Sequence, residues 1–314
     1  MQDLLFSANL VLPTFVIMGL GYLAKRVKLV NQGFLNSADK LSFRMFMFII
    51  LFYNIYSTDL GTAFNGKLVI FSVVSVLVID LFVFSLVPVF EKNNGRRGVL
   101  IQAMTRGNFI LFGIQICQAA YGAEGAAAVS VLCVFFAPLI NFFAVLALSL
   151  FNNEEGRMDV KKTLRSIATN PFILGALAGL IVNLSGLRFP YFFEKALGDV
   201  AKMGTTFAVF LLGAEFEMRS MQANAKAIAA ASFVKLLLAP AAVLTTAYFM
   251  GFRDMDFCIL IAAFASPVAV NSYVMAKLMH CDHDLAGQIL VSTVIFCSFT
   301  MFLFLFIAKR LSIM

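Results

Sequence analysis

Long apolar stretches separated by short polar connections run along the whole chain. A membrane-spanning helix needs about 20 predominantly apolar residues. On this criterion the sequence predicts ten spans, at residues 4–24, 41–57, 67–89, 98–121, 125–150, 170–187, 197–216, 225–250, 255–278 and 284–308. The pattern therefore predicts an all-α membrane protein with ten transmembrane helices.

Polar and helix-breaking residues interrupt two of these spans near their middle. The fourth span contains Thr105-Arg106-Gly107-Asn108-Phe109, and the ninth contains Ser266-Pro267-Val268-Ala269-Val270-Asn271. Non-helical backbone at membrane depth must be buried in protein or line a watery cavity, because lipid offers no hydrogen-bond partners. A matched pair of breaks, one in each half of the chain, indicates the binding site of a secondary transporter.

The two halves of the chain share a similar pattern of proline and glycine residues. Proline and glycine recur in spans one and six with offsets of 156 to 158 positions, at Pro13, Gly19 and Gly21 and again at Pro171, Gly175 and Gly179. Five spans per half give the second half the opposite orientation, so we expect two inverted five-helix repeats. Residues 1–151 form the first repeat, 152–169 a linker and 170–314 the second. The glycine pair of span six also permits close helix packing, within the chain or across a dimer.

Composition supports a membrane location. Hydrophobic residues make up 61% of the chain, charged residues 13%, and mean hydropathy is +0.92, whereas a soluble domain is about half apolar and a quarter charged. The net charge of +7 is scattered over short connections rather than gathered on one face, which argues against a nucleic-acid partner.

Lysine and arginine counts predict the orientation. Residues 4–24 have no preceding basic residue and are interpreted as a retained first span with its N-terminus outside. The inner connections then hold fourteen basic residues and the outer ones seven, which favours both termini outside. In the linker, Val160, Leu164 and Ile167 predict a short basic amphipathic helix on the inner membrane surface.

Enzymatic and metal chemistry have little basis in the sequence. The five cysteines include no CxxC pair, and no nucleophile–base pair, P-loop or dinucleotide fingerprint is present. The segment His280-Cys281-Asp282-His283 is interpreted as a solvated loop rather than a metal site. We therefore expect no enzyme activity, no cofactor and no bound metal.

Charged side chains at membrane depth are candidates for function. Asp80 lies in the third span and Lys235 in the eighth, at related places in the two halves. One hypothesis is that Asp80 carries a coupling proton. The alternative is a static pair of Asp80 with Lys235 or with Arg106.

Arg106 is the strongest candidate for ligand binding. It stands where a second half-helix would begin near Asn108, and helix N-termini attract anions. Its guanidinium would grip a carboxylate, or else pair with Asp80 inside the protein. We expect a substrate site at the two breaks, formed by Arg106, Gly107, Asn108, Ser266, Pro267 and Asn271, although these polar groups would also serve to satisfy the broken backbone.

Several motifs together resemble the auxin efflux carrier family of bacterial and plant transporters over essentially the whole chain. They are Arg106-Gly107-Asn108-Phe109, Phe112-Gly113, Tyr121-Gly122, Asn170-Pro171-Phe172-Ile173-Leu174-Gly175, Leu211-Leu212-Gly213-Ala214, Ser266-Pro267-Val268-Ala269-Val270 and Tyr273-Val274-Met275-Ala276. The chain departs from the family in the second span, where Phe48-Ile49-Ile50-Leu51 replaces a frequent proline. The fourth-span break also lacks a proline.

The resemblance implies a ten-helix inverted repeat of the bile-acid-transporter type, in which spans four and nine cross at Asn108 and Pro267. Spans one, two, six and seven would form a scaffold, often dimeric, and the other six a transport domain moving by an elevator step. Family substrates are organic anions, such as dicarboxylates in bacteria and indole-3-acetate in plants. The short linker favours a bacterial cytoplasmic membrane. Lys235 would then be a tethered cation where relatives of this architecture bind sodium.

The sequence thus predicts a homodimeric secondary transporter of a small organic anion, such as malate, malonate or an auxin-like acid. We expect protons or the membrane potential to drive it. One alternative is a sodium-coupled symporter of the bile-acid-transporter type, and another is a non-transporting membrane sensor that binds a ligand.

Overall fold

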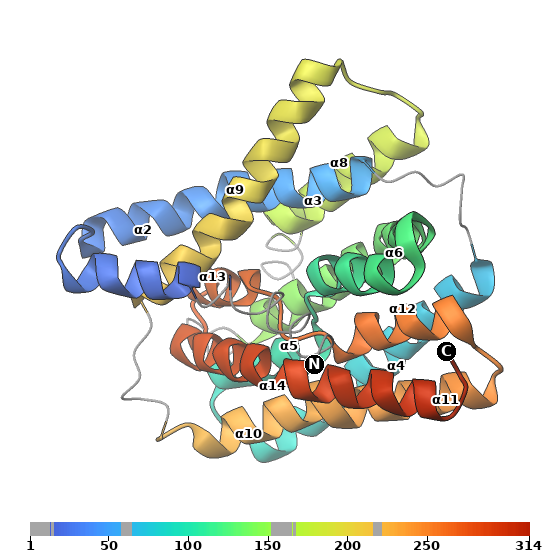
Figure 1. Ribbon diagram of the computed structural model, residues 1–314. Helices are drawn as coiled ribbons and strands as arrows, with labels where there is room; N and C mark the ends of the chain where they lie inside the picture. The colour runs from blue at the N-terminus through green and yellow to red at the C-terminus, as the bar shows by residue number, and fades with distance from the viewer. Residues whose placement is uncertain (1–12, 14–15, 58–64, 152–164, 166–167, 216–221) are drawn as a thin grey trace.

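The computed structural model describes residues 13, 16–57, 65–151, 165, 168–215 and 222–314. Within these residues the chain forms helices and no β-strand (Figure 1). The α-helices are α2 (Gln32–Leu41), α3 (Met47–Tyr56), α4 (Gly66–Phe90), α5 (Asn94–Thr105), α6 (Phe109–Leu150), α8 (Pro171–Leu184), α9 (Tyr191–Glu215), α10 (Ala225–Phe233), α11 (Ala239–Phe249), α12 (Asp254–Ala265), α13 (Asn271–Leu278) and α14 (His283–Arg310). Residues 16–26 are also helical, and most of the linker, with its predicted amphipathic helix, lies outside the described residues.

Two helices begin earlier than hydropathy predicts. The second predicted span starts at Gln32 rather than at residue 41, because the Asn31 side chain caps α2 by accepting a hydrogen bond from the Phe34 amide at 2.9 Å. A π-helical turn at Ser42–Phe46 then joins α2 to α3 without interruption. Likewise α9 begins at Tyr191 rather than at residue 197. Charged residues lower the hydropathy in the N-terminal halves of the continuous α2–α3 helix and of α9, and so conceal the two helix starts. They are Asp39 and Lys40 in α2 and Glu194, Lys195 and Asp199 in α9.

Five helices of the described residues are long and apolar enough to cross a membrane, which is typical of a multi-pass membrane protein. They are Gly66–Phe90, Glu124–Leu150, Tyr191–Ala214, Ala225–Phe249 and His283–Arg310. The fourth and ninth predicted spans are instead divided into shorter helices. Gly122, at φ 65°, separates two parts of α6 and so ends the fourth predicted span. The complete ten-helix inverted repeat stays a prediction.

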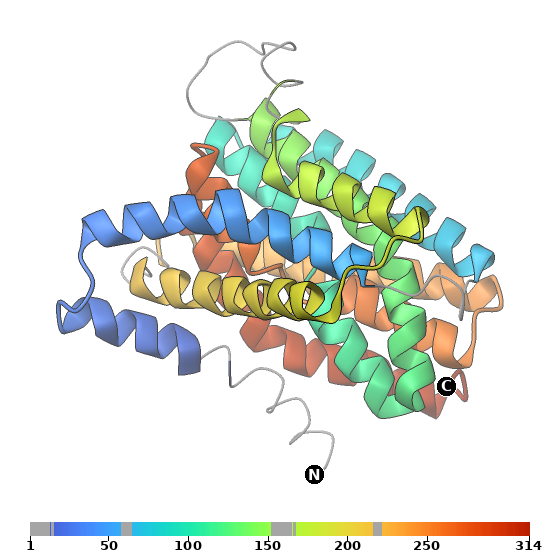
Figure 2. The same ribbon diagram turned by 90° about the horizontal axis from the view of Figure 1, so that it is seen from above.

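The helices lie in two layers (Figure 1). Helices α2, α3, α8 and α9 lie above α4, α5, α10, α11, α12 and α14, and the view from above shows α2, α3 and α9 lying across the rest (Figure 2). Lys277 of α13 forms an ion pair with Asp39 of α2, whose side chain is 1% exposed. This pair connects α13 to the upper layer.

Glycines allow α8 to pack against the backbone of α3. A Cβ atom at Gly175 would come within 3.0 Å of the Phe48 Cα, and one at Gly179 within 2.7 Å of the Phe52 carbonyl oxygen. Real Cβ atoms do not approach backbone so closely, so both positions need glycine. The Gly175–Gly179 pair therefore serves packing within the chain.

We expect Gly175→Ala to lower the free energy of unfolding by about 1–3 kcal/mol, because the added methyl group overpacks the α3–α8 contact. Thermal unfolding of the purified protein in detergent measures the change. Gly19→Ala is the matched control, since a Cβ atom there meets nothing within 4 Å. Equal stability of the Gly175→Ala variant and the wild type would contradict the packing argument.

Candidate functional site

The two predicted breaks meet inside the protein. Helix α5 ends at Thr105 and α6 starts at Phe109, while α12 ends at Ala265 and α13 starts at Asn271. The Asn108 amide donates a hydrogen bond to the Pro267 carbonyl at 2.7 Å, and Gly107 pairs with Val268 as an antiparallel β-bridge. Each break thus supplies hydrogen-bond partners for backbone groups that the other leaves open.

The two breaks have different local causes. At the second break Pro267 lacks an N–H group and favours extended backbone at Ser266, which has φ −63° and ψ 148°. The first break has no proline, and there Gly107 permits a close approach. A Cβ atom at Gly107 would clash with the Ser266 hydroxyl and come within 2.9 Å of the Lys235 ammonium nitrogen. A long-range contact therefore shapes the first break.

Lys235 is a buried cation at the place where the two breaks meet, which we call the crossing point. Its side chain is 3% exposed, and its ammonium group donates a hydrogen bond to the Phe264 carbonyl at 3.2 Å in the last turn of α12. Helices α5 and α12 both end here, and the carbonyl ends of helices carry partial negative charge. Lys235 therefore places a positive charge beside the partial negative charges at the carbonyl ends of these helices.

Asp80 shares this buried region. Its side chain is 1% exposed, and its carboxylate oxygens accept no hydrogen bond from any residue that the structure describes. The Lys235 charge acts on it electrostatically, although the two groups are not within 4.0 Å of each other. No hydrogen bond joins the Asp80 carboxylate to Arg106. The static pairing of Asp80 with Lys235 or Arg106 stays a prediction.

Arg106 connects the first break to the second half of the ninth span. Its guanidinium Nη1 donates to the Ser272 hydroxyl at 3.2 Å and contacts the Met275 sulfur at 3.1 Å, both on α13. Its side chain is 3% exposed. Arg106 therefore lies beside the N-terminus of α13 and close to that of α6, at the positive ends of two helix dipoles.

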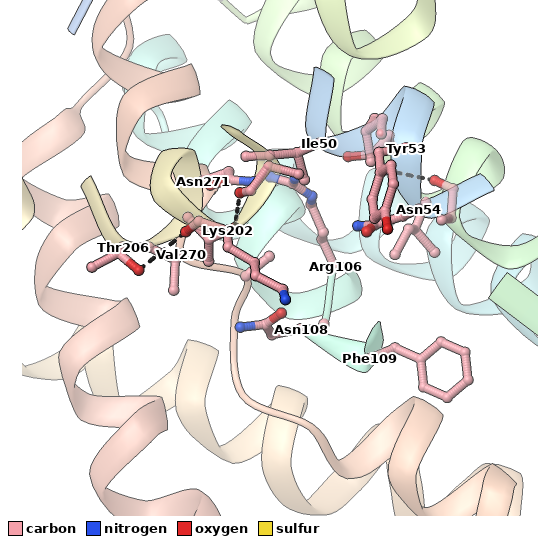
Figure 3. Close-up of a pocket in the computed structure, with 18 of the residues that line it drawn as sticks. Ile50, Tyr53, Asn54, Arg106, Asn108, Phe109, Lys202, Thr206, Val270 and Asn271 are labelled. Atoms are coloured by element: carbon pink, nitrogen blue, oxygen red, sulfur yellow. Dashed lines mark hydrogen bonds between the residues drawn. The ribbon is translucent and has the colours of Figure 1, made fainter. Parts of the chain in front are cut away.

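A cavity of about 380 Å³ lies between this crossing point and the helices α3 and α9 (Figure 3). Of the predicted site residues, Arg106, Gly107, Asn108 and Asn271 line it. Ser266 and Pro267 do not, because they lie within the crossing point, where Ser266 is fully buried. The other lining residues are Ile50, Leu51, Tyr53, Asn54, Phe109, Ala137, Ile140, Asn141, Gly198, Ala201, Lys202, Thr205, Thr206, Ala269 and Val270.

Sequence reasoning missed Lys202. Lys202 is one of the seven basic residues that the predicted topology places in the outer connections. In the structure it lies on α9 and lines the cavity, where its side chain extends toward Asn108 (Figure 3). The signal was present as small and polar residues at i, i+4 and i+7, namely Gly198, Lys202 and Thr205, which share one helix face. This face lies within the predicted span 197–216, but its exposure to the cavity depends on how α9 packs against the breaks.

Two comparisons with known proteins indicate the family and the general role of this chain. The model of the family described as "Membrane transport protein" matches residues 6–305. The chain belongs to this family. An uncharacterized transporter, YfdV, from Escherichia coli K12, from Escherichia coli O157:H7 and from Shigella flexneri is in each case 23% identical over 283 residues, which cover 87% of this chain and 88% of the relative. The resemblance to the auxin efflux carrier family is confirmed, and the chain is a transporter of the multi-pass membrane type.

Candidate metal ligands do not gather in this protein as far as the structure describes it. No group of three histidine, cysteine or acidic side chains occurs among those residues. In the segment at residues 280–283, the Cys281 thiol points to the Leu148 carbonyl at 3.5 Å, and the His283 ring packs against Tyr273. This segment joins the end of α13 to α14 through packing contacts.

Lys235→Met is expected to destabilise the protein by several kcal/mol, because it leaves the buried Asp80 carboxylate without a neighbouring positive charge. The double variant Asp80→Asn/Lys235→Met should recover most of this loss. Chemical unfolding of the wild type, both single variants and the double variant completes a double-mutant cycle. Strictly additive effects would mean that the two charges do not interact.

Proposed function

We propose that this protein is a secondary active transporter of a small organic anion, a mono- or dicarboxylate, in a bacterial cytoplasmic membrane. The observation that carries the proposal is the cavity beside the crossing point. Its charged lining residues among those described are Arg106 and Lys202, both cationic, and the N-termini of α6 and α13 adjoin it. A cavity with cationic side chains and two helix N-termini favours an anion.

The proposed movement is an elevator step between two inverted repeats. In this proposal α2, α3, α8 and α9, together with the first span, form a scaffold that also makes the homodimer, and the remaining helices form the transport domain. The cavity supports this division, because α3 and α9 line one side of it and the two breaks line the other. Sliding one layer past the other would carry the anion bound at the two breaks across the membrane, while α3 and α9 of the scaffold stay in place.

Lys235 supports a mechanism without sodium. Its ammonium group already hydrogen-bonds a carbonyl at the end of α12. A covalently attached cation there supplies the charge that a bound sodium ion would otherwise provide. We therefore propose that protons or the membrane potential drive the transport, with Asp80 as the proton carrier.

Arg106→Ala is expected to lower uptake of the transported anion into proteoliposomes by about 100-fold or more, because a buried charge partner of the substrate is lost. Arg106→Lys should restore only part of the flux, since lysine keeps the charge but not the forked geometry. Arg310→Ala, at the exposed end of α14, is the matched control and should transport normally. Full flux in Arg106→Ala would refute the anion-binding role, and binding without flux in the wild type would favour the sensor alternative.

The driving force is tested by imposing one gradient at a time on proteoliposomes. We expect a pH gradient or a membrane potential to drive uptake and a sodium gradient to have no effect. Asp80→Asn should abolish the response to the pH gradient. Uptake driven by sodium alone would support the bile-acid-transporter alternative, and an unchanged pH response in Asp80→Asn would make Asp80 a structural residue.

A further inference from the structure

Lys202 stands where two hollows of the protein join. One is the cavity beside the crossing point, and the other is a neighbouring hollow of about 410 Å³ along the N-terminal part of α9. Both are lined by Tyr53, Gly198 and Lys202. A substrate that passes from one hollow to the other therefore meets the Lys202 side chain, which is exposed.

The acidic residues near Lys202 already have other partners. Asp199 forms an ion pair with Lys195 at 2.7 Å, and the Glu194 carboxylate accepts a hydrogen bond from the Tyr56 hydroxyl at 3.3 Å. The Lys202 ammonium group makes no hydrogen bond with any residue that the structure describes, and it acts on Asp199 only by a charge interaction without direct contact. Its donors remain available to a ligand.

The two cations of the cavity come from different layers. Arg106 belongs to the crossing point, and its Nη1 is held by Ser272 on α13, whereas Lys202 extends from α9 on the opposite side toward Asn108 (Figure 3). No acidic side chain is among the residues that line the cavity. A ligand with one carboxylate could bind only one of the two cations at a time, and a ligand with two carboxylates could bind both.

We propose that Lys202 is the residue that sets how many negative charges the transported anion carries, selecting dianions over monoanions of the same length. This inference rests on the proposed transport of an organic anion. Arg106 binds one carboxylate in either case, and Lys202 binds the second from the facing layer. Specificity arises because only a dianion has a second carboxylate for Lys202 to bind, so a monoanion gains no binding free energy from Lys202.

The test compares matched pairs of ligands on the purified full-length protein. Unbranched dicarboxylates of three to six carbons and monocarboxylates of the same lengths serve as probes, with affinities measured by isothermal titration calorimetry at neutral pH, where all carboxyl groups are ionised. The wild type should prefer the dicarboxylate of one length. Lys202→Met should weaken its binding about tenfold, the effect of losing one charged hydrogen bond, and change monocarboxylate binding by less than about threefold.

Two further variants separate charge from structure. Lys202→Arg keeps the positive charge and should keep the preference for dicarboxylates. Lys226→Met removes an exposed lysine at the start of α10, away from the cavity, and should change neither affinity. The proposal is overturned if Lys202→Met weakens both ligand classes equally or leaves dicarboxylate binding unchanged.

Failure of the proposed transport function gives a different result. Selective dicarboxylate binding that depends on Lys202 but leads to no flux in proteoliposomes would support the role of Lys202 and refute transport. A wild type that binds neither ligand series would refute the anion site itself, and the role of Lys202 with it.

Discussion

Four half-helices end inside this protein, where neither lipid nor bulk water can bind the backbone groups left over at their ends. The Asn108 amide donates a hydrogen bond to the Pro267 carbonyl, so each satisfies the other, and the β-bridge between Gly107 and Val268 continues the pairing. Separating the two segments would leave buried N–H and C=O groups unpaired at a cost of about 1–3 kcal/mol for each group. This pairing therefore holds the first break beside the second.

The same pairing places the negative and the positive ends of the half-helices on different sides of the crossing point. The carbonyl ends of α5 and α12 lie on the side of Lys235, and the amide ends of α6 and α13 lie on the side of Arg106 and the cavity. Negative helix ends are therefore compensated within the protein, and positive helix ends remain for a ligand. The proposed anion site would therefore need no special arrangement of surface loops.

The features that could be predicted from the sequence are those marked by residues that differ from their immediate neighbours. Pro267 and the polar residues at 105–109 stand out because they interrupt apolar runs, so the breaks and the cavity-lining residues Arg106, Gly107, Asn108 and Asn271 could be located from neighbouring residues alone. The shape of the first break could not, because Gly107 is constrained by Ser266 and Lys235, which are far away in sequence. Lys202 was missed for a related reason, since its exposure to the cavity depends on how α9 packs against the breaks.

The ion pair between Lys277 and Asp39 has a kinetic consequence for any sliding of the layers. It joins α13 to α2, and the Asp39 side chain is almost completely buried. Parting the two charges before water or a new partner arrives costs several kcal/mol, and every 1.4 kcal/mol of barrier slows a step about tenfold. In the proposed elevator step, such a contact would be either made or broken, so it would hold the two layers in one register for a defined time and make the sliding stepwise rather than gradual.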